Sequence, residues 1–438
     1  MSALSSLQSV VEAPSEAASA ARPWPFAKRF AFTFSCILVV LQNFPFPFDY
    51  VPAFWKTIIW TDKLWNIAVA PMAKYVFHVA TGAPGGGDSV WRYVEVALFF
   101  AIALAGGLLW AALDRKRSRY ERAYELFRVY LRFTLAAAMV TYGAQKVIQA
   151  QFAPPTLDRL VTPFGSSSPM GILWAFMGVS KSYNFFTGAI ELISGILLTF
   201  RRTTLLGALV AAGAMANVVV LNYSYDVSVK IYSTQLLLQA IILVAPDARS
   251  LLDWFIFNRG VGAREDRPLF RGRALVTASL VARTLLVAWF VLFTFHWVQE
   301  TSKLAGLTQR SPLRGVWEVN ELTDNGVARP PLTTDATRWR RAVFDNPTNM
   351  SFFLMNDTRA RFNSKLDEKT HTLTLRNREN RNEVMTLRYA RPSPRVLMLD
   401  GVVSGHALHA KCDLSDVYEK PLLLTRGFHW VNELPVNR

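Results

Sequence analysis

The sequence is poor in charged residues and contains almost no cysteine. Asp, Glu, Lys and Arg make up only 18% of its 438 residues, whereas soluble proteins carry about 25%. The deficit is uneven, because long apolar runs alternate with charged segments, as in membrane proteins that carry a polar appendage. The two cysteines, Cys36 and Cys412, stand far apart in the chain, which argues against a disulfide framework and against thiol-based redox chemistry.

The common motifs of soluble enzymes are also absent. The sequence has no Gly-x-Ser-x-Gly nucleophile elbow, and its glycine-rich stretch 82–88 lacks the lysine of a phosphate-binding loop. No spacing of histidine and cysteine matches a zinc pattern, so we predict no metal site. The net charge of +16 comes without a nucleic-acid recognition motif. We therefore predict no nucleic-acid partner and assign the excess of Lys and Arg to cytoplasmic loops that face anionic lipid.

Apolar segments long enough to cross a bilayer recur along the first two thirds of the chain. Each contains roughly the 17–25 residues that a spanning helix needs. An aromatic-rich segment at 52–79 also contains Lys and Asp, which favours a helix that lies at the membrane interface. We predict about seven spans, with six and eight as alternatives. They cover 28–44, 90–113, 127–149, 183–200, 203–222, 228–245 and 274–297.

Three basic clusters indicate how these spans are oriented. They lie at 114–122, at 201–202 and between 249 and 273, the last with Arg249, Arg259, Arg264, Arg267, Arg271 and Arg273. In the seven-span arrangement all three fall on one side of the membrane, which the positive-inside rule makes cytoplasmic. We therefore expect a multi-pass bacterial inner-membrane protein with a cytoplasmic N-terminus. The outward-facing loops are then 45–89, 150–182 and 223–227.

Residues 305–438 contain no apolar run long enough to span a membrane. Short runs such as "THTLTLRN" and "RVLMLDGVV" alternate apolar and polar residues between turns, as antiparallel strands do. We predict an all-β barrel or sandwich on the periplasmic or extracytoplasmic side. The expected order is a disordered tail at 1–25, N-terminal spans with the interfacial helix at 26–119, a helical membrane bundle at 120–258, a cytoplasmic linker with the last span at 259–304, and the β domain at 305–438.

Several polar side chains are predicted to lie in the outer half of the membrane, where ionisable groups normally face a protein interior or water. Glu191, for example, lies eight residues beyond Tyr183, or about 12 Å deep at 1.5 Å per residue. Either these groups form a functional polar site, or Lys146 snorkels to water and Asp226 caps the helix that carries Lys230. The predicted site comprises Lys146, Glu191, Asn217, Asn222, Tyr225, Asp226 and Lys230.

The stretch 120–258 resembles the DoxX-like family of bacterial integral membrane proteins. The likeness is carried by Arg128 and Arg132, by "YGAQK" (142–146), by "G..EL.SG.LL.FRRT" (188–203) and by "NVVVLNYSYDVSVK" (217–230). It implies a four-helix membrane bundle, and it implies quinone chemistry because some relatives are subunits of a thiosulfate:quinone oxidoreductase. The whole chain resembles an uncharacterised subgroup with an added C-terminal domain.

Two motifs bracket the predicted β domain. "LRGVWEV" (313–319) and "TRGFHW" (425–430) are similar to the ends of lipocalin-like barrels, in which an arginine stacks on a first-strand tryptophan. The resemblance implies that Trp317 and Arg426 form a closing pair.

Three functions remain open on the sequence alone. An undetermined, non-catalytic or accessory membrane role ranks first, and it includes a scaffold or envelope-assembly factor that acts through the β domain. A quinone- or lipid-linked redox component ranks second, and a small-solute transporter ranks third. Quinone is the one cofactor that these hypotheses involve. The expected partners are the lipid bilayer and a membrane redox or envelope protein.

Overall fold

The computed structural model describes residues 24–48, 57–114, 120–260, 262, 272–304, 310–403 and 405–431. By its internal contacts the chain divides into a first unit, Met1–Ala136 with Ser228–Arg259, and a second unit, Ala137–Val227 with Gly260–Arg438. Each unit combines two separate stretches of the chain, whereas each predicted domain is one continuous segment. Most of the predicted disordered tail, residues 115–119 of the first basic cluster, and Arg264, Arg267 and Arg271 lie outside the described residues.

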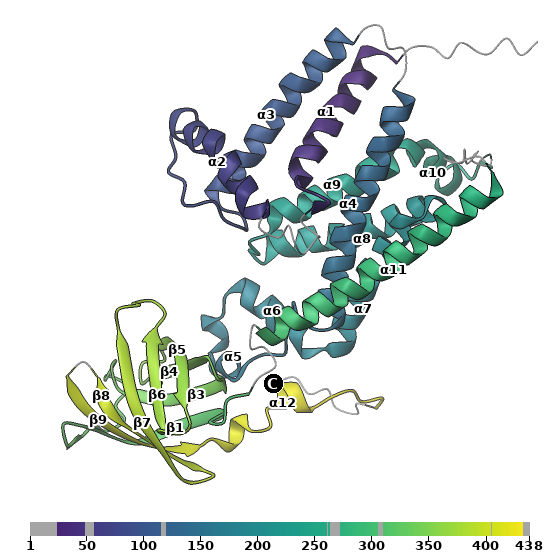
Figure 1. Cartoon of the computed structure of the whole chain (residues 1–438). Coiled ribbons are helices and arrows are strands. Elements are labelled where there is room, and N and C mark those ends of the chain that lie inside the picture. Colours follow the sequence, from purple (N-terminus) through teal and green to yellow (C-terminus); the bar gives the residue numbers. More distant parts are fainter. Residues whose placement is uncertain are drawn as a thin grey trace, which may run out of the picture. The chain divides into compact units, whose positions relative to one another are not determined.

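The first unit consists of helices whose contacts combine an apolar cluster around Trp91 with small and polar side chains. A Cβ on Gly107 would lie 3.0 Å from the backbone N of Phe34, so glycine permits the close packing of α1 and α3. Trp91 Nε1 donates a 2.8 Å hydrogen bond to Asn66 and joins α3 to α2. The elements are α1 (Phe26–Asn43), α2 (Thr57–Tyr75), α3 (Val90–Leu113), the first part of α4 (Glu121–Val147), α9 (Lys230–Val244), η5 (Ala245–Asp247) and α10 (Ala248–Phe255) (Figure 1).

The second unit begins with helices and ends with the β domain. Thr156, Ser168 and Ser180 each accept a hydrogen bond from the backbone N–H three residues later, which is the usual N-cap arrangement. Its helices are the end of α4, α5 (Leu157–Val161), η3 (Phe164–Ser166), α6 (Pro169–Val179), α7 (Lys181–Thr199), η4 (Arg201–Thr203), α8 (Thr204–Ser224) and α11 (Arg273–Leu304).

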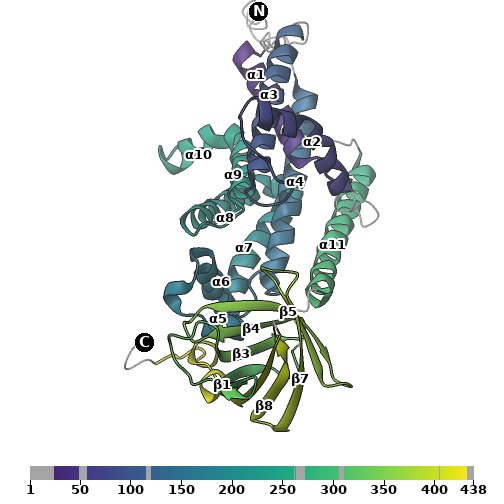
Figure 2. The ribbon, with the colours of Figure 1, turned by 90° about the vertical axis from the view of Figure 1, so that its left-hand side faces the viewer.

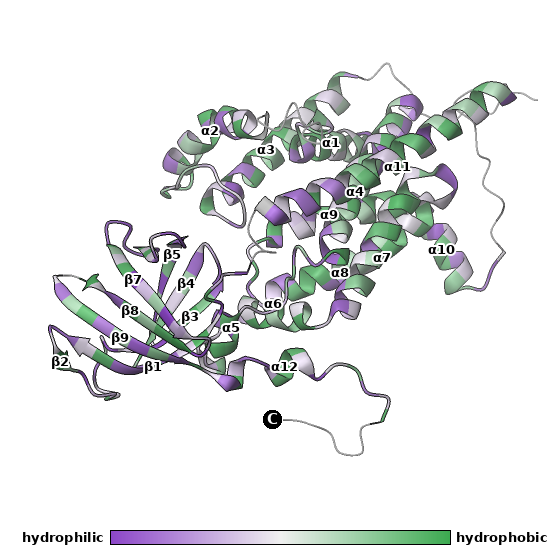
Figure 3. Cartoon of the chain, turned by 60° about the horizontal axis from the view of Figure 1, so that its bottom comes forward, coloured by the Kyte–Doolittle hydropathy of each residue, from purple (hydrophilic) through white to green (hydrophobic). Residues whose placement is uncertain are grey.

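Four helices among the described residues are long and apolar enough to cross a membrane: Val90–Leu113, Arg201–Ser224, Lys230–Phe255 and Arg273–Lys303. They coincide with four predicted spans, and the hydropathy colouring of Figure 3 shows how apolar α8 and α11 are. The spans predicted at 28–44, 127–149 and 183–200 form helices α1, α4 and α7. Their apolar sequence is shorter or is interrupted by charges such as Arg128 and Arg132 in α4. The structure therefore does not confirm a count of seven spans.

The β domain is a closed antiparallel barrel (Figure 2). Each strand from β3 to β8 pairs with the next one, and β1 pairs with both β3 and β9, which closes an eight-stranded barrel with the two-residue β2 beside it. Of the two predicted folds, barrel and sandwich, the structure shows the barrel. The strands are β1 (Gly315–Asp324), β2 (Val327–Ala328), β3 (Trp339–Asn346), β4 (Asn349–Leu354), β5 (Arg359–Asp367), β6 (Thr372–Asn377), β7 (Val384–Ser393), β8 (Val396–Val403) and β9 (His406–Leu414).

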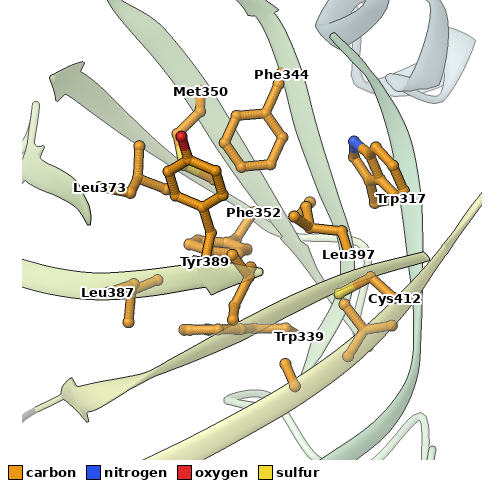
Figure 4. Packing of buried hydrophobic residues seen from close by; sticks show 14 of the residues in the cluster. Trp317, Trp339, Phe344, Met350, Phe352, Leu373, Leu387, Tyr389, Leu397 and Cys412 are labelled. Atoms are coloured by element: carbon orange, nitrogen blue, oxygen red, sulfur yellow. The ribbon is translucent and has the colours of Figure 1, made fainter. Parts of the chain in front are cut away.

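Side chains from all around the barrel fill its interior (Figure 4). The rings of Trp339 and Phe352 stack with their centroids 4.0 Å apart. Cys412 is fully buried in the same hydrophobic cluster. Burial raises the pKa of the Cys412 thiol to about 12. An eight-stranded barrel is just wide enough for side chains to fill, so its interior is a hydrophobic core.

Trp317 closes one end of this core, but with a different arginine from the predicted one. Its fully buried ring donates a 3.0 Å hydrogen bond from Nε1 to the carbonyl oxygen of Leu313. The guanidinium Cζ of Arg391 lies 5.5 Å from the ring centroid, and Arg391 also donates to two proline carbonyl groups. The position predicted for Arg426 is thus taken by Arg391, because β7 carries Arg391 to this end, whereas Arg426 follows α12 (Leu422–Thr425) beyond the last strand.

We expect Arg391→Ala to destabilise the barrel by about 1–2 kcal/mol, since it removes a cation–π contact and two hydrogen bonds. Hydrogen exchange of peptides from β1 and β7 in the full-length protein measures this local loss. Arg426→Ala is the matched control and should leave these peptides unchanged. Faster exchange in Arg426→Ala than in Arg391→Ala would contradict this account and favour the predicted pair of Trp317 and Arg426.

Candidate functional site

Lys146 and Glu191 form a buried ion pair between helices of the second unit. Lys146 lies in the last turn of α4 and Glu191 in the middle of α7, and the lysine Nζ is 2.6 Å from each carboxylate oxygen. Their side chains are only 7% and 4% exposed. A buried charge without a partner costs several kcal/mol, and here each group neutralises the other. The structure thus brings together two residues of the predicted site.

Two glycines let α4 and α7 approach closely enough to form this pair. Gly143 precedes Lys146 by three residues and Gly188 precedes Glu191 by three, which places each glycine one turn from the charged residue on the same helix face. A Cβ on Gly143 would lie 2.6 Å from the backbone N of Leu192, and one on Gly188 would lie 2.8 Å from the carbonyl oxygen of Gly143. A crossing of this kind is typical of helices in membranes.

Asn184 ties the connection after α4 to the start of α7. Its Nδ2 donates to the carbonyl oxygens of Phe152 and Met177 at 2.9 and 3.2 Å. Asn184 Oδ1 and Asn222 Nδ2 are buried without a hydrogen-bond partner among the described residues. Each such atom typically costs about 1–3 kcal/mol, so a polar group bound beside either of them would gain a hydrogen bond.

The end of α8 carries the other predicted residues of this unit. Asn222 is buried there, whereas Asn217, Tyr225 and Asp226 are exposed. The helix ends at Ser224, where the N–H of Tyr225 bonds back to the last turn at 2.9 Å. Asp226 follows with φ at 50°, a left-handed conformation that aspartate tolerates better than most residues. Of these four residues, the structure places only Asn222 in the interior.

Lys230, the last predicted residue, opens α9 in the first unit and pairs with Asp88. Its Nζ is 3.7 Å from Asp88 Oδ2. The same carboxylate accepts hydrogen bonds from the backbone N–H groups of Lys230 and Ile231, at 2.8 and 3.0 Å. These two N–H groups are therefore capped by Asp88, whereas the sequence suggested Asp226 for this role. The two partners are 142 positions apart, so no local pattern indicated the contact.

A second buried acid in the first unit was missed by the sequence reasoning. Glu95 in α3 is 4% exposed and accepts a hydrogen bond from Arg92, whose guanidinium also lies 3.5 Å from Asp62 in α2. The signal was present in the sequence, because a glutamate three residues after an arginine inside a predicted span is an i,i+3 ion pair.

The loop after α4 contains a helix that docks on the outside of the barrel. In α5, Leu157 and Val161 are buried against apolar side chains of the barrel wall. Figure 2 shows α5 beside β3 and β4. The barrel side of this apolar cluster consists of Val316, Val343 and Phe353.

Charged groups surround this apolar contact. Arg359 Nη1 donates to Asp158 Oδ2 at 2.7 Å and to Thr162 Oγ1 at 2.9 Å. The backbone N–H of Leu157, at the start of α5, donates to Asp345 Oδ2 at 3.2 Å. The two side chains of the ion pair are 18% and 28% exposed. The barrel is thus attached to the helices by a second contact besides the chain connection through α11.

The site offers charge compensation more readily than covalent chemistry. Both oxygens of Glu191 accept hydrogen bonds from Lys146. The described residues contain no group of three or more His, Cys, Asp or Glu side chains that could hold a metal ion. The geometry therefore fits an ion pair that stabilises the packing of α4 against α7.

Part of the chain is similar to a curated protein of Bacillus subtilis (strain 168), the Uncharacterized protein YwoB. The two are 32% identical over 129 residues, which make up 30% of this chain and 79% of the relative. No family model matches the chain, and no solved structure matches it.

Replacing one member of the ion pair should destabilise the protein strongly. Lys146→Met leaves the Glu191 charge buried and unpaired, which typically costs about 3–5 kcal/mol. The combined variant Lys146→Met, Glu191→Leu should recover most of the loss, because apolar replacement of a buried pair is often neutral. Thermal unfolding of the detergent-solubilised protein measures both effects. Lys181→Met, at the exposed start of α7, is the control, and a double variant no more stable than the single one would contradict the ion-pair account.

Reversing the charge of Asp158 should loosen the docked barrel. Asp158→Arg places two like charges together, and we expect the free energy of α5 docking to fall by about 1 kcal/mol or more, because the pair is partly exposed. Backbone hydrogen exchange in α5 should then be roughly fivefold faster. Adding Arg359→Asp restores the pair with its charges exchanged and should slow exchange again. Asp357→Arg, in an exposed pair elsewhere on the barrel, should have no effect on α5.

Proposed function

Because the chain belongs to the same family as the Uncharacterized protein YwoB of Bacillus subtilis, whose name assigns no activity, we propose a function from its geometry. We propose that it is a non-catalytic scaffold of the bacterial inner membrane. Its helices hold the β-barrel at the periplasmic surface, and the barrel binds a partner protein of the cell envelope.

The attachment of the barrel through α5 is the observation that carries this proposal. A barrel joined only by a flexible linker would need no specific contact with an outward-facing loop. Here apolar packing, the Asp158–Arg359 ion pair and the hydrogen bond from the Leu157 N–H to Asp345 act together. Such a contact restricts the orientations of the barrel, which suits a domain that presents one surface to a partner.

The packed barrel interior supports a role for the outer surface. Lipocalin-sized barrels that carry ligands keep space inside, whereas this interior holds a continuous cluster of aromatic and aliphatic side chains. Binding by this domain would therefore use its outer wall and loops. Exposed apolar residues on that surface include Val327, Val384 and Val402.

The ion pair fits the same scaffold. Lys146 and Glu191 neutralise each other across two helices joined by a glycine crossing. α5 lies in the connection between these two helices, and only a short segment separates it from Lys146. Rigid helices at this point would hold α5, and with it the barrel, in place. Membership of the DoxX-like family, and a cytoplasmic N-terminus with a periplasmic barrel, are part of this proposal and rest on the motifs and basic clusters of the sequence.

A quinone- or lipid-linked redox component is the second candidate. It is favoured by the orphan polar atoms Asn184 Oδ1 and Asn222 Nδ2, because a carbonyl or hydroxyl head group could bond to them. In that case the protein would retain quinone through gentle extraction, and Asn222→Leu would release it.

Photo-crosslinking in native membranes tests the scaffold. A photoreactive amino acid at Val384 or Val402, which are 50% and 62% exposed on the barrel, should form adducts with a protein of the envelope. The same residue at Leu292 in α11 is the control and should react mainly with lipid. The Asp158→Arg variant should lower the barrel adducts, because the barrel is no longer held in one orientation. Absence of protein adducts from the barrel, together with quinone retained in equimolar amount, would favour the redox candidate instead.

A further inference from the structure

We propose that residues 420–431, the C-terminal arm, lie in the head-group region of the membrane and anchor the barrel to the lipid surface. This inference goes beyond the scaffold, since it assigns the arm a lipid partner and not a protein. It shares with the scaffold only the assumption that the barrel is held beside a membrane.

The composition of the arm is that of an interfacial segment. Lys420 and Arg426 provide positive charge, and the arm has no acidic residue. Tryptophan, phenylalanine and leucine beside basic residues are the side chains that lie at the boundary between head groups and acyl chains. The exposed apolar residues are Leu422 (44%), Leu423 (55%), Leu424 (38%), Phe428 (77%), Trp430 (92%) and Val431 (73%). Figure 3 shows the hydrophobic colouring of α12.

The arm leaves the barrel at the face that docks on the helices. Just before it, η6 (Asp416–Tyr418) contacts α5, and Tyr418 packs beside the apolar cluster of Leu157 and Val161. Arg341 lies over the Tyr418 ring, with its Cζ 5.7 Å from the centroid. Tyr418 therefore fixes the start of the arm beside α5, so the arm is continuous with the contact between barrel and helices.

The position of α5 brings this face near the ends of α4 and α7, which the scaffold proposal places in the membrane. Leu157 in α5 lies ten positions after Val147, the end of α4, which limits the distance between them to about 35 Å even for an extended chain. Asn184 shortens the connection further, because it binds the carbonyl group of Phe152 to the start of α7. An arm that starts at Tyr418 can therefore reach the membrane surface into which α4 and α7 lead.

The local structure of the arm favours lipid over a second copy of the chain. It contains one helix of four residues, and Gly427 then turns the chain with φ at 68°. The rings of Phe428 and Trp430 pack edge to face, 5.0 Å apart. A bilayer accommodates such an irregular apolar segment, whereas a stable dimer requires a larger and more regular complementary surface.

Fluorescence in lipid nanodiscs tests the anchor on the full-length chain. An environment-sensitive dye is attached to Trp430→Cys in nanodiscs of zwitterionic and anionic phospholipids with brominated acyl chains. The control dye is at Val327→Cys, which follows the far end of β1 from the α5 contact, about 30 Å along the strand. Cys36 is replaced by Ala, and Cys412 stays unlabelled because it is fully buried.

We expect the dye at position 430 to be blue-shifted and quenched at least about twofold more than the dye at 327, because interfacial segments lie roughly 5–10 Å inside the head-group boundary. Lys420→Glu with Arg426→Glu should reduce this quenching in anionic nanodiscs and have little effect in zwitterionic ones. Equal quenching at both positions would overturn the anchor. A blue shift of the dye at position 430 that appears only in nanodiscs with two chains would assign the arm to a contact with a second copy of the chain. Neither result depends on the barrel adducts that test the scaffold.

Discussion

The ion pair between Lys146 and Glu191 is the interaction on which the second unit depends. A lysine or a glutamate alone would be unfavourable when buried between two helices, but a 2.6 Å contact with both carboxylate oxygens lets the two helices bury them together. The glycines one turn away remove the side chains that would keep the helices apart. The pair therefore sets the geometry of α4 and α7, and with it the loop between them.

The loop between α4 and α7 contacts both the helices and the barrel. Asn184 binds it on one side through Phe152 and Met177, and α5 binds the barrel on the other through Arg359 and Asp345. Polar contacts of this kind are individually weak when partly exposed, but the apolar cluster between them excludes water and holds them together.

Sequence reasoning located the site better than it identified the partners. The burial of Glu191 and Lys146 could be expected from their places in apolar segments, yet their direct contact joins residues 45 positions apart. The alternation of residues predicted the strands, and the pairing of β1 with β9 then made a barrel of them. The arginine over Trp317 was assigned to Arg426 from a family resemblance, but Arg391 occupies the position because β7 passes that end of the barrel.

By itself the sequence determined the properties that depend on neighbouring residues: apolar helices long enough for a bilayer, a C-terminal domain of alternating strands, and ionisable groups inside apolar segments. These follow from side-chain hydrophobicity and from the periods of helix and strand, which any short window of residues displays. Only the tertiary structure decided which charges meet, that Asp88 caps α9, and that α5 docks on the barrel wall. Such contacts join residues far apart in the chain, and their energies arise only after packing has removed water from both partners.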